Sequence, residues 1–215
     1  MTKTEVFWKS FWDNATSTQH ESEEIDWLKK HATELASIIP KNISSVLEIG
    51  CADGRLSSEL GFAEYRYTGV DFSTTLLSRL PREKFGMDSQ FFLEDGSKFY
   101  HGEKYDLIFS NAVIQNFDEP MLRSHLKNSL NMLEPGGVII CGDVPDESKR
   151  FAYLSRKRNG KISYRGILAY LLGKSTMIWY RKSKIKSLAF ELGLTAEFIE
   201  GQNYPYRYHV VLKLR

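Results

Sequence analysis

The chain has 215 residues, of which 42% are hydrophobic and 26% are charged, and its formal net charge at pH 7 is +2. This composition is typical of one globular domain over residues 1–215, and it excludes a disordered or fibrous protein. No apolar run reaches the length of a membrane span, and the N-terminus lacks the apolar core of a signal peptide. The two cysteines, Cys51 and Cys141, form neither a disulfide framework nor a zinc pattern, so we expect a reducing cytoplasm.

Residues 1–40 are predicted to form a helical cap. Aromatic side chains at the start recur at the spacing of one face of an amphipathic helix: Phe7, Trp8, Phe11 and Trp12. Ser22 is the expected N-cap of a second helix, which Pro40 ends. We expect both helices to pack on the body of the domain.

The segment VLEIGCADGRLSSEL, residues 46–60, predicts a buried strand, a tight turn and a helix. Glycines at 50 and 54 allow a ligand to approach the backbone closely, and the free N–H groups of the helix face the turn. The spacing departs from the dinucleotide pattern G-x-G-x-x-G. Glu48, within the strand end, would repel a pyrophosphate but can hold a cationic group, directly or through water.

The next strands each end in polar residues. A second strand, residues 65–70, leads to Asp71, which lies 21 residues after Gly50, where a βαβ unit places the acid that binds ribose hydroxyls. Ser73 is a predicted helix N-cap. A third strand, 90–93, is followed by Glu94, Asp95 and Gly96. A fourth, 105–109, runs into Ser110, Asn111 and Ala112.

The remaining elements complete an alternation of helices and strands. Asp118 is expected to cap a helix, and a fifth strand is predicted over 138–141. Ser183 is the predicted N-cap of a later helix that Gly193 ends. Two strands follow, 195–200 and 204–215. In the last of these, Tyr206, Tyr208, Val210, Leu212 and Leu214 alternate with Arg207, His209 and Lys213.

The spacing Glu-x-Gly-x-Ala-x-Gly from Glu48 to Gly54 resembles motif I of the class I S-adenosylmethionine-dependent methyltransferases. Ala52 stands where that family usually has glycine. Residues 133–137, LEPGG, are similar to the L-x-P-G-G that precedes strand five in the family. The resemblance covers residues 45–143 closely. It implies an α/β fold, a three-layer sandwich around a seven-stranded, mostly parallel sheet with an antiparallel last strand.

The resemblance also implies S-adenosylmethionine as the cofactor and an N-terminal helix that serves as a lid. In the family, acids after strands two and three bind the ribose and the adenine, and the end of strand four faces the transferred methyl group. Members of the family that methylate amino groups of nucleic-acid bases typically have the motif N/D-P-P-Y/F after strand four. This motif is missing here, which favours oxygen or carbon acceptors. The implied cofactor-binding residues are Glu48, Gly50, Cys51, Ala52, Asp53, Gly54, Asp71, Phe72, Glu94, Asp95, Gly96, Ser110, Asn111 and Ala112.

Residues 144–182 are predicted to be a basic helical insertion that forms part of the acceptor site. Lys149 to Lys186 contains twelve Lys or Arg and no acid, which leaves −10 for the rest of the chain. Several partners stay open: a small-molecule or glycan acceptor that is anionic or lipid-linked, nucleic acid, or a peripheral membrane contact without a transmembrane segment. The insertion and the Tyr-rich stretch 204–209 also resemble methyltransferases of bacterial surface-polysaccharide pathways.

Methyl transfer to a hydroxyl benefits from a general base. Asp143, at the end of strand five, and His209, on the last strand, are the predicted catalytic residues. Each has a structural interpretation as well, as a turn residue and as a satisfied strand residue. The family chemistry needs no metal, and no His, Cys or carboxylate spacing predicts a metal site. An RNA methyltransferase and a non-catalytic cofactor-binding adaptor are the alternatives.

Overall fold

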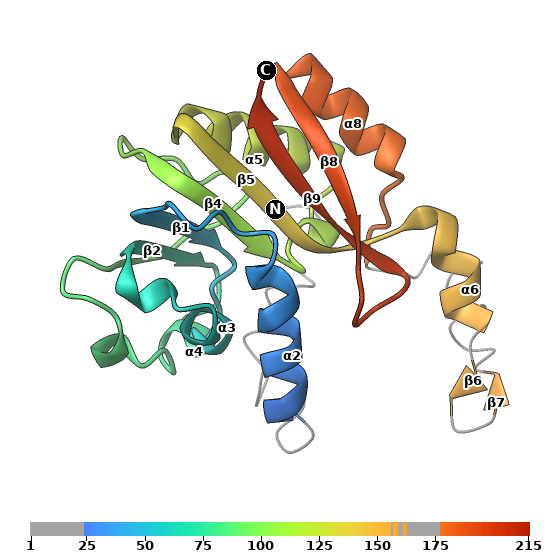
Figure 1. The fold of residues 1–215 in the computed structure, drawn as a ribbon, viewed down its shortest axis with the longest axis horizontal. Coiled ribbons are helices and arrows are strands. Elements are labelled where there is room, and N and C mark those ends of the chain that lie inside the picture. Colours follow the sequence, from blue (N-terminus) through green and yellow to red (C-terminus); the bar gives the residue numbers. More distant parts are fainter. Residues whose placement is uncertain (1–23, 156, 159–160, 163–176) are drawn as a thin grey trace.

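The computed structural model describes residues 24–155, 157–158, 161–162 and 177–215 (Figure 1). The predicted aromatic helix near Phe7 and the predicted N-cap Ser22 lie outside these residues. So does most of the predicted insertion after residue 162. None of the helices in the described part combines the length and apolar character needed to cross a membrane.

A seven-stranded sheet in the order β3-β2-β1-β4-β5-β9-β8 forms the centre of the molecule. The first five strands pair in parallel, and β9 is antiparallel to both of its neighbours. The predicted seven-stranded, mostly parallel sheet with an antiparallel last strand is confirmed. The strands are β1 (Ser45–Ile49), β2 (Arg66–Asp71), β3 (Gln90–Leu93), β4 (Tyr105–Asn111), β5 (Leu133–Pro145), β8 (Leu194–Glu200) and β9 (Arg207–Leu214).

Helices cover both faces of this sheet (Figure 1). The α-helices are α2 (Glu24–Ala36), α3 (Arg55–Glu59), α4 (Thr74–Leu77), α5 (Glu119–Asn131), α6 (Arg150–Ser155) and α8 (Lys182–Glu191). Short 3₁₀ turns are η1 (Phe62–Glu64), η2 (Arg82–Lys84), η3 (Ile114–Asn116) and η4 (Glu147–Lys149). A small separate pair, β6 (Lys157–Arg158) and β7 (Lys161–Ile162), lies beyond α6, away from the main sheet.

Alternation along the central strands produces two cores. In β4, Ile108 packs in the cluster that contains residues of α5 and α8, whereas Leu107 and Phe109 pack in the cluster that contains residues of α2 and α4. In β9, Val210 and Val211 divide between the two clusters in the same way. Because successive side chains of a strand point to opposite faces, each strand contributes to both cores. The three-layer α/β/α sandwich follows from this pattern.

Helix caps agree with the sequence at two of the three predicted positions that lie within the described residues. The Ser73 side chain accepts a hydrogen bond from Leu76 N, and the Asp118 side chain accepts one from Met121 N. The prediction of Ser183 as an N-cap is wrong, since α8 begins at Lys182 and Arg181 occupies the N-cap position. The Arg181 carbonyl accepts hydrogen bonds from Lys184 N and Ile185 N, and the Arg181 side chain makes no capping hydrogen bond.

Two strands differ from their predicted extents by three or more residues at one or both ends. Strand β5 already pairs with β4 at residue 133 and runs to residue 145, past the predicted 138–141. Strand β9 begins at residue 207, not 204, and residues 208–212 are all buried. The predicted alternation of the last strand is therefore not an inside-outside pattern. The side that holds His209 is covered by α2, which places Leu35 in the same core as Val211.

Candidate active site

The loop after β1 is a compact turn of left-handed residues. Gly50, Ala52 and Gly54 have φ angles of 78°, 51° and 74°. The N–H groups of residues 50 and 51 both donate to the Val70 carbonyl, which fixes the loop against the end of β2. A Cβ on Gly50 would lie 2.3 Å from Val113 Cγ2, so the glycine is required both by its backbone and by its neighbour.

Asp71 ties that loop to the end of β2. Its Oδ2 accepts a hydrogen bond from Ala52 N at 3.0 Å, and its Oδ1 accepts one from Ser73 N at 2.8 Å. Burial raises the pKa of Asp71, although these backbone hydrogen bonds oppose the shift. Phe72, the next residue, is half-buried. The structure thus brings the two predicted cofactor segments around Gly50 and Asp71 into direct contact.

Glu48 lies beneath the loop and is 2% exposed. Its Oε2 accepts hydrogen bonds from the Ser57 hydroxyl at 2.5 Å and from the Tyr67 hydroxyl at 2.7 Å. Burial raises the pKa of Glu48 to about 7, with the hydroxyl hydrogen bonds opposing the shift. The groups that hold this carboxylate therefore come from α3 and β2, and they support the loop from within the protein.

Because burial raises the pKa of Glu48, we expect the free energy of unfolding to depend on pH. Between pH 4.5 and 7 the folded protein holds a proton on Glu48 that the unfolded chain releases, so the free energy of unfolding falls as pH rises through this range. Glu48→Gln should remove up to about 3 kcal/mol of that fall. Urea unfolding at pH 5 and pH 8 measures it, with the exposed Glu59→Gln as the matched control. Parallel profiles for wild type and Glu48→Gln would contradict the assignment.

The loop after β3 also reaches this edge of the sheet. Asp95 is half-buried, and its Oδ1 accepts from both the N–H and the hydroxyl of Ser97. Burial would raise its pKa, but these hydrogen bonds and Lys98 outweigh burial and lower it. Glu94 is exposed, and its N–H donates to the Asp71 carbonyl. The loops after β2 and β3 are therefore hydrogen-bonded to each other.

Gly96 is held from below by two buried residues. A Cβ at this position would lie 2.3 Å from Ile49 Cγ2. The ring of His125 lies 3.3 Å from the Gly96 carbonyl through Nδ1. His125 belongs to α5 and is buried.

The ends of β4 and β5 lie side by side. Asn111 pairs with Gly142, and Ala112 N donates to the Gly142 carbonyl. The Asn111 Oδ1 atom is buried and accepts no hydrogen bond in the described structure. Ala112 and Asp143 have φ angles of 55° and 52°. With Ala52 they are the non-glycine residues of the described chain at positive φ, and all three lie at this one edge, where such strain commonly marks a functional site.

Asp143 and His209 meet in a buried cluster with two residues of α2. His31 Nε2 lies 3.3 Å from Asp143 Oδ2, and His209 Nε2 lies 3.0 Å from Glu34 Oε1. The Asp143 N–H donates to His209 Nδ1 at 3.1 Å. All four side chains are buried. The sequence predicted Asp143 and His209 but missed His31 and Glu34, because only the packing of α2 on the sheet brings them there.

The hydrogen bonds of His209 define its tautomer. Nδ1 accepts from a backbone N–H, so it carries no proton, and the proton on Nε2 is donated to Glu34. Both ring nitrogens are therefore occupied. His31 differs, since neither of its ring nitrogens makes a hydrogen bond to a described residue, although the side chain is fully buried. Within the described residues, no group of three or more His, Cys, Asp or Glu is arranged to hold a metal ion.

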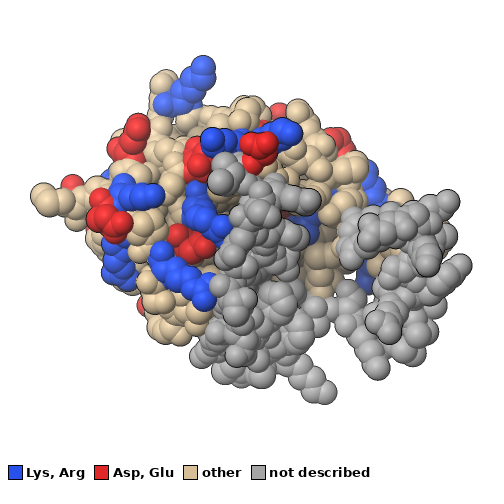
Figure 2. Space-filling view, turned by 90° about the horizontal axis from the view of Figure 1, so that it is seen from below, with Lys and Arg blue, Asp and Glu red and all other residues tan. Residues whose placement is uncertain are grey.

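Four basic side chains in the described part of the basic segment form ion pairs with acids. Lys149 and Lys182 both form ion pairs with Glu200, Arg150 pairs with Glu147, and Lys184 with Glu119. Figure 2 shows positive and negative side chains intermixed on the face it presents. Trp179 and Tyr180, predicted as part of the acceptor segment, are buried. The Tyr180 hydroxyl donates to the Phe117 carbonyl.

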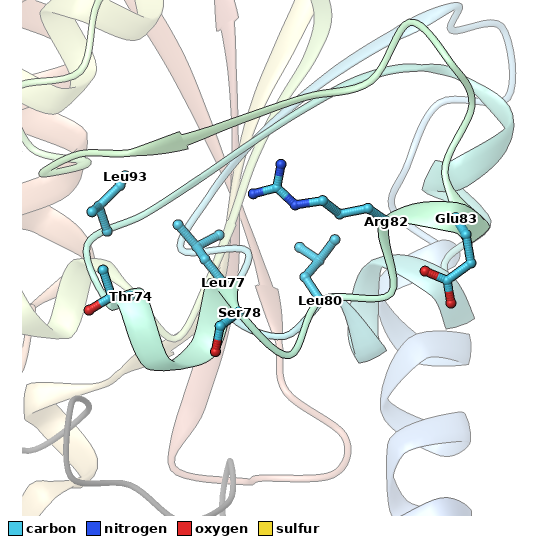
Figure 3. Close-up of a pocket in the computed structure, with 7 residues that line it drawn as sticks. All are labelled: Thr74, Leu77, Ser78, Leu80, Arg82, Glu83 and Leu93. Carbon is cyan, nitrogen blue, oxygen red and sulfur yellow. The ribbon is translucent and has the colours of Figure 1, made fainter.

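A hollow lies beside α4 and the edge strand β3 (Figure 3). It is lined by Thr74, Leu77, Ser78, Leu80, Arg82, Glu83 and Leu93. None of the predicted cofactor residues is among them. The hollow is therefore separate from the predicted cofactor residues.

Known proteins match both the sequence and the fold. Residues 47–139 match a family model described as a methyltransferase domain. Malonyl-[acyl-carrier protein] O-methyltransferase of Bacillus anthracis is 25% identical over 137 residues, 60% of this chain and 50% of that protein. Ubiquinone biosynthesis O-methyltransferase of Dinoroseobacter shibae is 25% identical over 126 residues, 57% of this chain and 50% of that protein.

Solved structures extend the likeness to the whole sheet. Magnesium protoporphyrin IX methyltransferase from Synechocystis, crystallised with bound S-adenosylhomocysteine, has a TM-score of 0.68 and 12% identity, covering 99% of this chain and 100% of that one. DesVI of Streptomyces venezuelae has a TM-score of 0.66 and 16% identity, covering 87% and 92%.

The fold is thus the Rossmann-like fold of class I methyltransferases. Within this fold, residues 47–139 are similar to the methyltransferase domain of the family model, and the neighbouring structures include a methyltransferase with bound S-adenosylhomocysteine. The chain spans about half the length of the curated relatives it matches.

Proposed function

We propose that this protein transfers the methyl group of S-adenosylmethionine to an oxygen atom of a small-molecule acceptor. The observation that carries the proposal is the joining of two cofactor segments by Asp71, whose carboxylate holds the loop after β1 at the end of β2. This is the edge at which open α/β sheets bind nucleoside ligands.

The residues at this edge fit the cofactor. The Asp71 carboxylate suits the ribose hydroxyls, Asp95 and the backbone at Gly96 suit the adenine, and the unpartnered Asn111 Oδ1 offers an acceptor to the amino group of the methionine portion. The bound cofactor supplies an activated methyl group on a sulfonium. The protein's own task is to bind it, orient the acceptor and take up a proton.

An oxygen acceptor is favoured by two independent observations. The residues after β4, Ser110 to Val113, do not form the base-amine motif of the family. The two relatives described above are named O-methyltransferases, one acting on a malonyl group and one in ubiquinone biosynthesis. A glycan acceptor stays within this proposal. We place the reaction in the cytoplasm, where the free thiols of Cys51 and Cys141 would stay reduced.

RNA is a weaker candidate acceptor. Phosphate recognition needs cations that can exchange small counterions for the nucleic acid. The basic side chains Lys149, Arg150, Lys182 and Lys184 each have an acidic partner within the protein. Pairing of this kind leaves less positive charge for a polyanion than the sequence suggested.

Isothermal titration with S-adenosylhomocysteine tests the cofactor assignment, with NAD as the control ligand. We expect binding of S-adenosylhomocysteine with a Kd on the order of micromolar and no binding of NAD, because the sequence after β1 departs from the dinucleotide pattern G-x-G-x-x-G, with Ala52 and Arg55 at its second and third glycine positions. Absence of binding by S-adenosylhomocysteine would refute the enzymatic proposal. Binding of NAD alone would indicate a dehydrogenase-type site.

A further inference from the structure

We infer that His31 and Asp143 form the pair that accepts the proton of a hydroxyl acceptor, and that His209 and Glu34 are positioning residues for this pair. The inference rests on the proposed methyltransferase function and assigns roles at its acceptor side. It adds His31 and Glu34, and it changes the role predicted for His209.

Asp143 lies at the β5 end of the sheet edge, next to the end of β4. Asn111, at the end of β4, pairs with Gly142, and Asp143 is the next residue of β5. The left-handed φ of 52° at Asp143 turns this residue out of the regular strand geometry. Aspartate tolerates this conformation better than most residues, because its short side chain bonds locally. The β5 end therefore presents a carboxylate beside the strand end where the family's transferred methyl lies.

The two histidines differ in whether their ring nitrogens are hydrogen-bonded. His209 has both ring nitrogens engaged, with the Asp143 N–H and with Glu34. It has no vacant nitrogen for a substrate proton. His31 is 0% exposed, has no hydrogen bond at either nitrogen within the described part of the chain, and its Nε2 lies 3.3 Å from Asp143 Oδ2. An imidazole beside a carboxylate is the arrangement by which a general base is oriented.

Glu34 holds the cluster of His31, Asp143 and His209 in place. The Glu34 carboxylate accepts hydrogen bonds from Gln202 N, from Asn203 N and Nδ2, and from His209. These contacts fix α2 to the turn between β8 and β9. Because His31 lies one turn before Glu34 on the same helix, fixing Glu34 also fixes the imidazole against Asp143. The rings of Trp27 and Tyr204, both half-buried, lie 5.0 Å and 6.5 Å from the ring of His31.

The reacting group of the acceptor follows from this charge distribution. A carboxylate acceptor has no proton to lose at neutral pH and would be repelled by Asp143 and Glu34. A neutral hydroxyl has a proton to give and hydrogen-bonds to the pair. In the transfer, the acceptor oxygen forms a bond to the methyl carbon as the carbon–sulfur bond breaks. The bond pair stays on sulfur, and the hydroxyl proton passes to the His31–Asp143 pair and then to solvent.

Sinefungin tests this placement without an acceptor, because a protonated amine replaces the transferred methyl in this analogue. The measured quantity is the ratio of the Kd of S-adenosylhomocysteine to that of sinefungin, by titration. Asp143→Asn should lower this ratio about tenfold, the worth of one hydrogen bond to a charged group. His31→Gln should lower it by a smaller factor. Asparagine also tolerates the left-handed backbone at this position.

The control is the exposed Glu197→Gln on β8, which removes one negative charge from the same sheet and should leave the ratio unchanged. Both site variants should keep the affinity for S-adenosylhomocysteine within about twofold if they fold, because the change lies outside the cofactor loops. A ratio that is unchanged or raised in either site variant overturns the pair. Loss of S-adenosylhomocysteine binding in the wild type would instead refute the proposed function.

A second measurement addresses the acceptor group. Wild-type protein with radiolabelled S-adenosylmethionine and malonyl-coenzyme A, a soluble carboxylate probe, should give no labelled methyl ester. Formation of that ester would overturn the assignment of a hydroxyl acceptor.

Discussion

Asp71→Ala is expected to weaken binding of S-adenosylhomocysteine by about 100-fold or more. The substitution removes the acceptor proposed for the ribose hydroxyls. It also leaves Ala52 N and Ser73 N without their hydrogen-bond partner, so the loop after β1 loses its tie to β2. Titration calorimetry measures the loss. The exposed Asp88→Asn is the control for removal of one negative charge and should bind like the wild type.

Asp71→Asn separates the two effects of that substitution. The amide keeps the size of the side chain but has one acceptor oxygen, so it can satisfy only one of the two backbone donors. We expect an affinity between those of the wild type and the alanine variant. Wild-type affinity in Asp71→Ala would mean that the ligand does not lie at the end of β2, and the cofactor assignment would have to be withdrawn.

Glu34→Gln is expected to lower the free energy of unfolding at pH 7 by about 3 kcal/mol or more, since buried donors would then face an amide group. The Glu34 carboxylate accepts hydrogen bonds from Gln202, Asn203 and His209, and no neutral amide can accept all of them. Urea unfolding measures the difference. The exposed Asp26→Asn on the same helix should stay within about 0.5 kcal/mol of the wild type.

The pH dependence of this effect has a definite sign. Burial acts to raise the pKa of Glu34, but hydrogen bonds from His209 and from the N–H groups of Gln202 and Asn203 outweigh it and lower the pKa. A lowered carboxyl pKa contributes stability that is present above pH 4.5 and lost as pH falls. The difference between wild type and Glu34→Gln should therefore shrink below pH 4.5. A difference that stays constant down to pH 3 would contradict the role of the ionised carboxylate.

Local sequence patterns predicted the elements around the cofactor edge well. Strand β3 matches its predicted bounds, and Ser73 and Asp118 cap the helices expected of them. These features depend on neighbours within a few residues, which the sequence displays directly. The prediction of Ser183 failed because α8 begins before it, at Lys182, which leaves Ser183 inside the first turn and Arg181 at the N-cap position.

The acceptor side depended on contacts between distant segments. Glu34 and His209 are 175 residues apart and His31 and Asp143 are 112 apart, yet both pairs lie within 3.3 Å. No short sequence motif indicates that these distant residues come into contact. The basic segment also depends on a distant residue. Glu200, which forms ion pairs with Lys149 and Lys182, follows the segment in the chain and meets these lysines only after folding.

The sequence by itself determined the order of strands and helices along the chain, the tight turn at Gly50 to Gly54 and the acid at Asp71, because turns and strand ends depend on adjacent residues. Only the tertiary structure decided that Glu48 is an internal support, that His209 has no nitrogen to spare, and that His31 stands beside Asp143. The physical reason is that the protonation and hydrogen bonding of a buried group are set by whichever distant side chains exclude water from it.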